Sequence, residues 1–424
     1  MQYRFLTVSA LVAGASATSF PNYLGFNSGS SKADGSAKFQ SDFEQEMNTA
    51  QNLKGAPGNF NAVRLYTNIQ SYTTSDPIQA FPAAIATNTS LLLGIWASGT
   101  TSIQNEIAAL KAGLAAHGTD LADRIIGVSI GSEDLYRNSA TGVTNKAGIG
   151  ADPDVIVGFI KDFKTAFADT ALKDVSIGHV DTWDAYTNGS NKAVIDAVDW
   201  LGIDEYPYYQ TGDGNKIENA ASLFMEAYDK VVAIAGSKDV WVTETGWPYT
   251  GPDWDEAVAS VANAKTYWDD VGCDNLFGNV PTFWYNLVED SATNEMSFAI
   301  TKDLSTTPLF DLSCPAKSKS TTTSKSGAKS TASSSSAAAT ASEDSTGKKA
   351  SGSTTTSSSD STATGSSDSS SSASSTAKSG SSSTASSASS SSTSDVAASG
   401  ASAAKLGSSA FAAIAFVAAA FALF

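Results

Sequence analysis

Eight short apolar runs, separated by helix-like stretches, are the feature that most restricts the fold of this 424-residue chain. Within each run the apolar residues are nearly continuous instead of alternating with polar ones, which is typical of parallel strands buried on both faces. We therefore expect strands at residues 23–26, 62–66, 91–96, 124–133, 175–180, 200–206, 240–242 and 280–286.

Between these runs, apolar residues recur at helical spacing. The expected helices cover residues 39–53, 77–87, 103–117, 154–168, 192–198, 217–235 and 254–271. Strands that alternate with helices over about 250 residues or more predict a single (β/α)8 domain, a TIM barrel. A doubly wound open sheet is the alternative, but no GxGxxG or GxxxxGK[ST] loop follows the first strand, and so the usual reason to prefer it is missing.

The first 17 residues have the composition of a secretory signal. Arg4 precedes an apolar run from Phe5 to Ala13, and Ala15-Ser16-Ala17 fits the small-residue pattern of a cleavage site. We therefore expect an exported protein whose barrel domain occupies residues 18–315.

Residues 316–399 consist mainly of Ser, Thr, Ala and Gly and almost lack aromatic and branched apolar side chains. Such a segment has little to offset the entropy lost on ordering. Its composition predicts a disordered, O-glycosylated stalk, and a bare linker is the alternative.

The C-terminal stretch, residues 400–424, ends in an apolar run from Ala410 to Phe424 without a charge. This run is shorter than the ~20 residues needed to cross a bilayer. Because small residues precede it, it predicts the removable signal of a glycosylphosphatidylinositol (GPI) anchor, with attachment at Gly400 or Ser399. A short tail anchor is the alternative. We expect the mature protein at the outer face of the cell membrane and in the cell wall.

Charge and residue counts exclude several function classes. A formal net charge of −17 argues against nucleic acid as a partner and is compatible with a neutral polysaccharide. Cys273 and Cys314, the only cysteines, predict one disulfide in an exported protein, with two free thiols as the alternative. His117 and His179 are the only histidines, which leaves almost no material for a His-based metal site or a Ser-His-Asp triad. We expect a monomer without metal or cofactor.

Two of the expected strands end in a glutamate. Glu133 ends the fourth strand, and Glu244 follows the seventh just before Gly246 and Pro248. Active sites of (β/α)8 barrels lie at the carboxyl ends of the strands, so both carboxylates should face the central pocket. Two such carboxylates flanking a glycosidic bond are what sugar hydrolysis requires. For each glutamate alone, a salt-bridged rim residue is the alternative, and Glu205 is the reserve candidate.

The motifs around these glutamates carry a family resemblance. Gly127-Val-Ser-Ile-Gly-Ser-Glu-Asp-Leu-Tyr-Arg137 and Val242-Thr-Glu-Thr-Gly-Trp-Pro248, with Val63-Arg-Leu-Tyr66 and Tyr206-Pro-Tyr208, resemble glycoside hydrolase family 17, the glucan endo-1,3-β-glucosidases, and its fungal cell-wall branch. The resemblance covers essentially the whole folded domain. It implies that Glu133 is the proton donor and Glu244 the nucleophile of a retaining enzyme. One position departs from the pattern: related barrel glycosidases place Asn before the acid glutamate, where it contacts the sugar 2-hydroxyl, and this chain has Ser132.

Further residues near strand ends are candidates for sugar binding: Arg64, Tyr66, Ser132, Tyr206, Trp247 and Trp284. The rings of Tyr206 and Trp247 are expected to stack on pyranose faces. Core packing is the alternative for the aromatic residues, and it accounts equally well for Trp284. Arg64 is expected to neutralise a buried carboxylate, which within the barrel is Glu244 itself.

Three polar residues have other expected roles. His179 is expected to be a hydrogen-bonded core residue. Asn88 and Asn188 begin Asn-x-Ser sequons and are expected to be N-glycosylated at the surface of an exported protein.

Together these features predict a secreted, GPI-anchored retaining endo-hydrolase of β-1,3-glucosidic bonds in cell-wall glucan. Two alternatives stay open. One is a β-1,3-glucanosyltransferase on the same scaffold, in which a second sugar instead of water takes the glucosyl group. The other is a non-catalytic glucan-binding wall protein.

Overall fold

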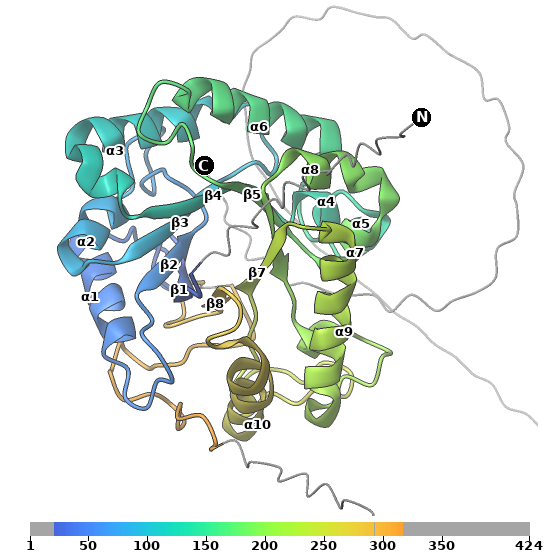
Figure 1. Cartoon of the computed structure of the whole chain (residues 1–424). Coiled ribbons are helices and arrows are strands. Elements are labelled where there is room, and N and C mark those ends of the chain that lie inside the picture. The colour runs from blue at the N-terminus through green and yellow to red at the C-terminus, as the bar shows by residue number, and fades with distance from the viewer. Residues whose placement is uncertain (1–20, 292, 317–424) are drawn as a thin grey trace, which may run out of the picture. The chain divides into compact units, whose positions relative to one another are not determined.

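The computed structural model describes residues 21–291 and 293–316, so the expected signal and nearly all of the expected stalk and anchor segments lie outside the described residues. Eight parallel strands close into a barrel in chain order, β1-β2-β3-β4-β5-β6-β7-β8, and helices surround it (Figure 1). The predicted (β/α)8 fold is confirmed.

The strands overlap all eight apolar runs. They are β1 Leu24–Ser28, β2 Ala62–Leu65, β3 Ser90–Ile95, β4 Ile125–Ser132, β5 Ile177–Asp181, β6 Trp200–Asp204, β7 Asp239–Glu244 and β8 Thr282–Trp284. Glu133 therefore follows β4 directly and Glu244 is the last residue of β7.

The longer helices follow the expected stretches. They are α1 Gln40–Gln51, α2 Ala80–Thr87, α3 Gln104–Ala122, α6 Pro153–Phe167, α8 Lys192–Ala197, α9 Ile217–Ala235 and α10 Val261–Tyr267, which continues as a π-helix over Trp268–Leu276. Three short helices were not predicted, because four or five residues are too few to show a helical period: α4 Asp134–Arg137, α5 Ala140–Thr144 and α7 Trp183–Thr187. Two 3-10 turns cover Gly189–Asn191 and Pro207–Tyr209.

The predicted helix at 254–271 begins too early. Trp254 lies in a loop instead, where its Nε1 donates to Thr211 Oγ1 at 3.0 Å and its ring packs edge-on against Tyr209. The helix starts only at Val261, because the Ser260 side chain accepts a hydrogen bond from the Asn263 backbone N–H and so caps it.

An apolar plug fills the amino-terminal part of the barrel. The rings of Trp200 and Trp241 stack there with centroids 4.5 Å apart, and both side chains are fully buried. A Cβ atom on Gly178 would lie 2.3 Å from the Trp200 ring, so only glycine fits at that position on β5. The buried polar residues described below lie beyond this plug, toward the carboxyl ends of the strands.

Cys273 and Cys314 form a disulfide, as predicted. It ties the π-helix to the C-terminal end of the described domain across a sequence separation of 41 residues. A closed loop of that length is worth about 4 kcal/mol in the chain-entropy account of disulfide stabilisation. Within residues 21–291 and 293–316, no helix has both the length and the apolar character needed to span a bilayer.

Candidate active site

Three groups hold the carboxylate of Glu244. Arg64 on β2 donates from Nη1 to Oε1 at 2.6 Å, and the Tyr66 hydroxyl donates to the same oxygen at 2.7 Å. The Tyr206 hydroxyl donates to Oε2 at 2.8 Å. Charge-assisted hydrogen bonds of this length favour an ionised, oriented carboxylate. The Glu244 side chain remains 12% exposed, so it lies at the boundary of the buried network.

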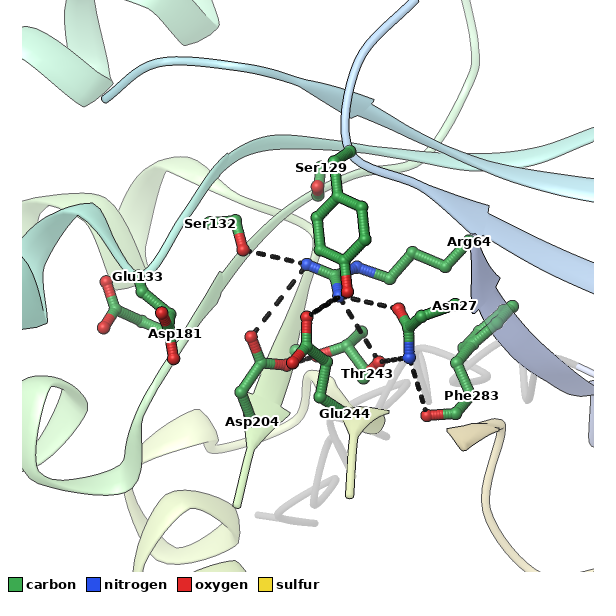
Figure 2. A network of polar contacts seen from close by, with 12 residues as sticks. Asn27, Arg64, Ser129, Ser132, Glu133, Asp181, Asp204, Thr243, Glu244 and Phe283 are labelled. Carbon is green, nitrogen blue, oxygen red and sulfur yellow. Dashed lines mark hydrogen bonds and ion pairs between the residues drawn. The ribbon is translucent and has the colours of Figure 1, made fainter. Parts of the chain in front are cut away.

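Residues on β1 and β4 hold Arg64 in turn (Figure 2). Its Nη1 also donates to Asn27 Oδ1 on β1 at 2.8 Å, and its Nη2 donates to Ser132 Oγ on β4 at 2.9 Å. Asn27 in turn donates from Nδ2 to the carbonyl oxygens of Thr243 and Phe283. The guanidinium is almost completely buried, and the expected pairing of Arg64 with Glu244 is observed.

Glu133 has a different environment. Its backbone adopts a left-handed conformation with φ 58°, which turns the chain from β4 into α4. Its Oε2 accepts from Arg137 Nη2 at 3.0 Å. Burial raises the pKa of the Glu133 carboxyl to about 7; the charges of Glu244 and Asp181 act in the same direction, and Arg137 opposes them. A carboxyl with this pKa holds its proton in a large fraction of molecules at neutral pH.

Asp204, the last residue of β6, lies beside Glu244 in the network (Figure 2). Its Oδ1 accepts from Thr243 Oγ1 at 2.7 Å, and its Oδ2 lies 3.9 Å from Arg64 Nη2. Burial, reinforced by the charge of Glu244 and opposed by Arg64, raises the pKa of Asp204 well above its usual value.

His179 is a core residue, as expected. Its Nδ1 lies 2.6 Å from the Ile130 carbonyl oxygen and its Nε2 lies 3.0 Å from Asp181 Oδ2. The carbonyl oxygen can only accept, so Nδ1 carries a proton. Burial opposes the charged ring, but the bond to Asp181 prevails and raises the pKa of His179. Asp181 also accepts from the backbone N–H groups of Leu135 and Tyr136, and so it fixes the turn that follows Glu133.

The aromatic candidates divide into two groups. Tyr66 and Tyr206 contact Glu244 through their hydroxyls. Trp247 and Trp284 are each 2% exposed: Trp247 packs edge-on against Tyr208, and Trp284 packs against Trp268. Neither tryptophan has an exposed ring face, so neither is placed to stack on a sugar.

The reserve candidate Glu205 lies outside this cluster. Its buried carboxylate accepts from Gln210 Nε2 at 2.7 Å, and burial raises its pKa well above the usual value, helped by the charge of Asp184. Its backbone N–H donates to the Glu244 carbonyl oxygen at 3.0 Å, but among the described residues no side-chain hydrogen bond or ion pair joins it to Glu133 or Glu244.

Sequence reasoning missed three residues that organise the site. Asn27 and Asp181 are ordinary strand residues in the sequence, and no local pattern marks them. The pairing of Arg137 with Glu133 could have been predicted, because Arg137 follows Glu133 by four residues, the spacing at which side chains on a helix meet.

Two further observations concern the predicted glycosylation sites and metal binding. Asn88 and Asn188 are both exposed, and their glycosylation stays a prediction. In residues 21–291 and 293–316, no group of three or more His, Cys, Asp or Glu side chains is placed to hold a metal ion.

The comparisons with known proteins all indicate a glycoside hydrolase family. The profile of the BtgE/BtgC glycoside hydrolase domain matches residues 25–301. The Aspergillus niger protein named "Probable glucan endo-1,3-beta-glucosidase eglC" is 56% identical over 306 residues, which cover 72% of this chain and 66% of the relative. The Aspergillus fumigatus protein of the same name is 55% identical over 322 residues, covering 76% of this chain and 70% of the relative. The chain thus spans about two thirds of the length of these relatives.

Among solved structures, a glycoside hydrolase family 17 β-1,3-glucanosyltransferase from Rhizomucor miehei is similar to this chain. The two share 25% sequence identity at a TM-score of 0.54, and the match covers 68% of this chain and 98% of the other.

Proposed function

This chain belongs to the BtgE/BtgC glycoside hydrolase family, and from that premise we propose that it cleaves internal β-1,3-glucosidic bonds of cell-wall glucan with retention of configuration. One observation carries the proposal. Glu244 is held as a carboxylate by Arg64 and two tyrosine hydroxyls, whereas the pKa of Glu133 is raised to about 7 by burial. One ionised and one protonated glutamate are the pair that a two-step glycosidase needs.

In the first step, a Glu244 oxygen attacks the anomeric carbon, and the bond from that carbon to the departing sugar oxygen breaks. Glu133 gives its proton to that oxygen, so the shortened chain leaves as an alcohol. The product is a covalent glucosyl-enzyme on Glu244, and Glu133 is left as a carboxylate. The two tyrosines and Arg64 keep the attacking carboxylate oriented.

In the second step, Glu133 takes a proton from water, and the water oxygen attacks the anomeric carbon. The bond to Glu244 breaks, Glu244 regains its charge, and Glu133 regains its proton. Two displacements at one carbon restore the β configuration. The names of the Aspergillus relatives support β-1,3-glucan as the substrate.

A second candidate is glucanosyl transfer, which is favoured by the similarity to the Rhizomucor miehei transferase. In that reaction the hydroxyl of another glucan chain takes the place of water in the second step. The site chemistry described above is the same for both outcomes.

Product sizing from a laminari-oligosaccharide of uniform length tests these proposals. Hydrolysis predicts that shorter chains with new reducing ends accumulate from the start. Chains longer than the substrate would identify transfer as the main reaction. If neither shorter nor longer chains form, the enzymatic proposal is wrong and the protein is a non-catalytic glucan-binding wall protein.

We also propose that the mature protein is a monomer, anchored by GPI at Gly400 or Ser399 to the outer face of the cell membrane and in contact with the wall. The anchoring is supported by the apolar C-terminal run, and export by the disulfide, which suits an oxidising compartment. Phosphatidylinositol-specific phospholipase should release the protein from washed membranes into the aqueous phase. A variant that ends before Ala410 lacks the predicted anchor signal, so it should be found in the aqueous phase without the phospholipase. Detection of peptides from residues 410–424 in the mature protein by mass spectrometry would contradict the anchor.

A further inference from the structure

Arg137 is held on three sides at the end of α4. Its Nη2 donates to Glu133 Oε2 at 3.0 Å and its Nη1 donates to Ser98 Oγ at 2.8 Å. Its guanidinium carbon lies 5.2 Å from the ring centroid of Trp96. Only 7% of Arg137 is exposed. The side chain is therefore fixed in one position against the acid glutamate.

A second set of contacts fixes the groups around this pair. The Ser98 hydroxyl accepts from Arg137 and donates to Asp134 Oδ1 at 2.7 Å. Asp134 Oδ2 accepts from the backbone N–H of Ser132 at 2.7 Å. The Asp134 carboxylate therefore binds both Ser132, which precedes Glu133, and Ser98, which holds Arg137. These contacts fix Arg137 relative to Glu133.

The charges around Glu133 are unequal. Arg137 is the one cation in contact with it among the described residues. Besides burial, two acids on the neighbouring strands raise its pKa, Glu244 on β7 and Asp181 on β5. Two further titratable groups, Asp204 on β6 and Tyr209 beyond β6, interact with Glu133, and besides burial the charge of Glu133 raises the pKa of each. Arg64, the other buried arginine of the site, binds Glu244 and Ser132 instead.

We propose that Arg137 is the positioning residue that lets Glu133 change role between the two steps, because it stabilises the carboxylate that must act as base. This inference rests on the proposed two-step function. After the first step Glu133 has given up its proton, and the ion pair with Arg137 holds the resulting charge in a site that otherwise disfavours it. Burial raises the pKa of Glu133, and Arg137 is the main group that lowers it, so loss of Arg137 moves the titration of Glu133 to higher pH.

The test uses the full protein with Arg137→Met, which keeps a long side chain against Trp96, and Arg137→Lys, which keeps the charge. With an aryl β-laminaribioside that carries a dinitrophenyl leaving group, the first step needs no proton, so kcat reports the second step. In Arg137→Met the acid limb of kcat should move up by about one pH unit or more, because Glu133 must lose its proton to act as base. In Arg137→Lys the acid limb should lie close to its wild-type position, because lysine keeps the positive charge.

Arg124→Met is the matched control. Arg124 precedes β4 at the amino end of the barrel and contacts Asn88, away from the site. Its variant should keep both limbs of the wild-type pH profile. An Arg137→Met enzyme that loses activity equally at every pH, with unmoved limbs, would show that Arg137 only supports the fold and would overturn the proposal.

A direct titration separates this inference from the proposed function. In protein labelled with 13C at the glutamate carboxyls, the Glu133 signal is assigned by its loss in Glu133→Gln. Its midpoint should be higher in Arg137→Met than in wild type, whether or not the protein cleaves β-1,3-glucan. Equal midpoints in wild type and Arg137→Met would overturn the role of Arg137. If Arg137→Met does not fold, Ser98→Ala takes its place, because it removes the hydrogen bond that holds the arginine. A Ser98→Ala midpoint equal to that of wild type would then overturn the role in the same way.

Discussion

Glu244→Gln should lower the rate of β-1,3-glucan cleavage by about four orders of magnitude or more, the scale seen when a nucleophile is removed from an enzyme. The amide cannot form the glucosyl-enzyme, so both steps are lost. Because glutamine has nearly the same shape and Arg64, Tyr66 and Tyr206 stay in place, glucan binding should persist. Reducing-end assays measure the rate, and calorimetry with a laminari-oligosaccharide measures the binding.

Glu205→Gln is the control for this substitution. Glu205 is a buried glutamate that follows the neighbouring strand and has the same type of side chain, but it binds Gln210 and lies outside the site. Its variant should keep most of the wild-type rate. A Glu244→Gln enzyme that retains more than about one hundredth of the wild-type rate would contradict the assignment of the nucleophile, because a loss of 100-fold is small for such a group.

Glu133→Gln should lower the cleavage of natural glucan by about 10²- to 10⁴-fold, the usual contribution of a general acid and base. Substrates with a dinitrophenyl leaving group should still form the glucosyl-enzyme, because that leaving group needs no proton. External azide needs no general base either, so it should restore turnover and give a β-glucosyl azide.

The pH dependence gives the same prediction a second readout. Since burial raises the pKa of Glu133 to about 7, kcat/KM on natural glucan should fall as the pH rises through that value, because the acid form is lost. This limb should be absent in Glu133→Gln. An α-glucosyl azide from the Glu133→Gln variant, or a β-azide from Glu244→Gln, would reverse the roles of the two residues.

The barrel was predictable because its strands are buried on both faces and so appear as uninterrupted apolar runs. The position of the two glutamates followed from the same reasoning, since each ends such a run and the carboxyl ends of the strands share one rim. The pairing of Arg64 with Glu244 also followed, because a buried carboxylate at that rim needs a cation.

The orientation of individual side chains could not be predicted from the sequence. Trp247 lies just beyond a strand end, as Tyr206 does, yet its ring packs against Tyr208 while the Tyr206 hydroxyl reaches Glu244. Position along a strand does not decide which way a residue in the following turn points. The contacts that fix the site are also non-local: Asn27 binds Arg64 across 37 positions, and Asp181 binds Leu135 across 46.

The central claim is that Glu244 and Glu133 carry out a double displacement on β-1,3-glucan. The most direct measurement is the proton NMR spectrum of the products formed in the first minutes of cleavage of a laminari-oligosaccharide, before the anomers equilibrate. The account predicts that the β-anomer of the new reducing end appears first and that the α-anomer follows only by mutarotation. The α-anomer as the first product would show a single displacement and would contradict the account.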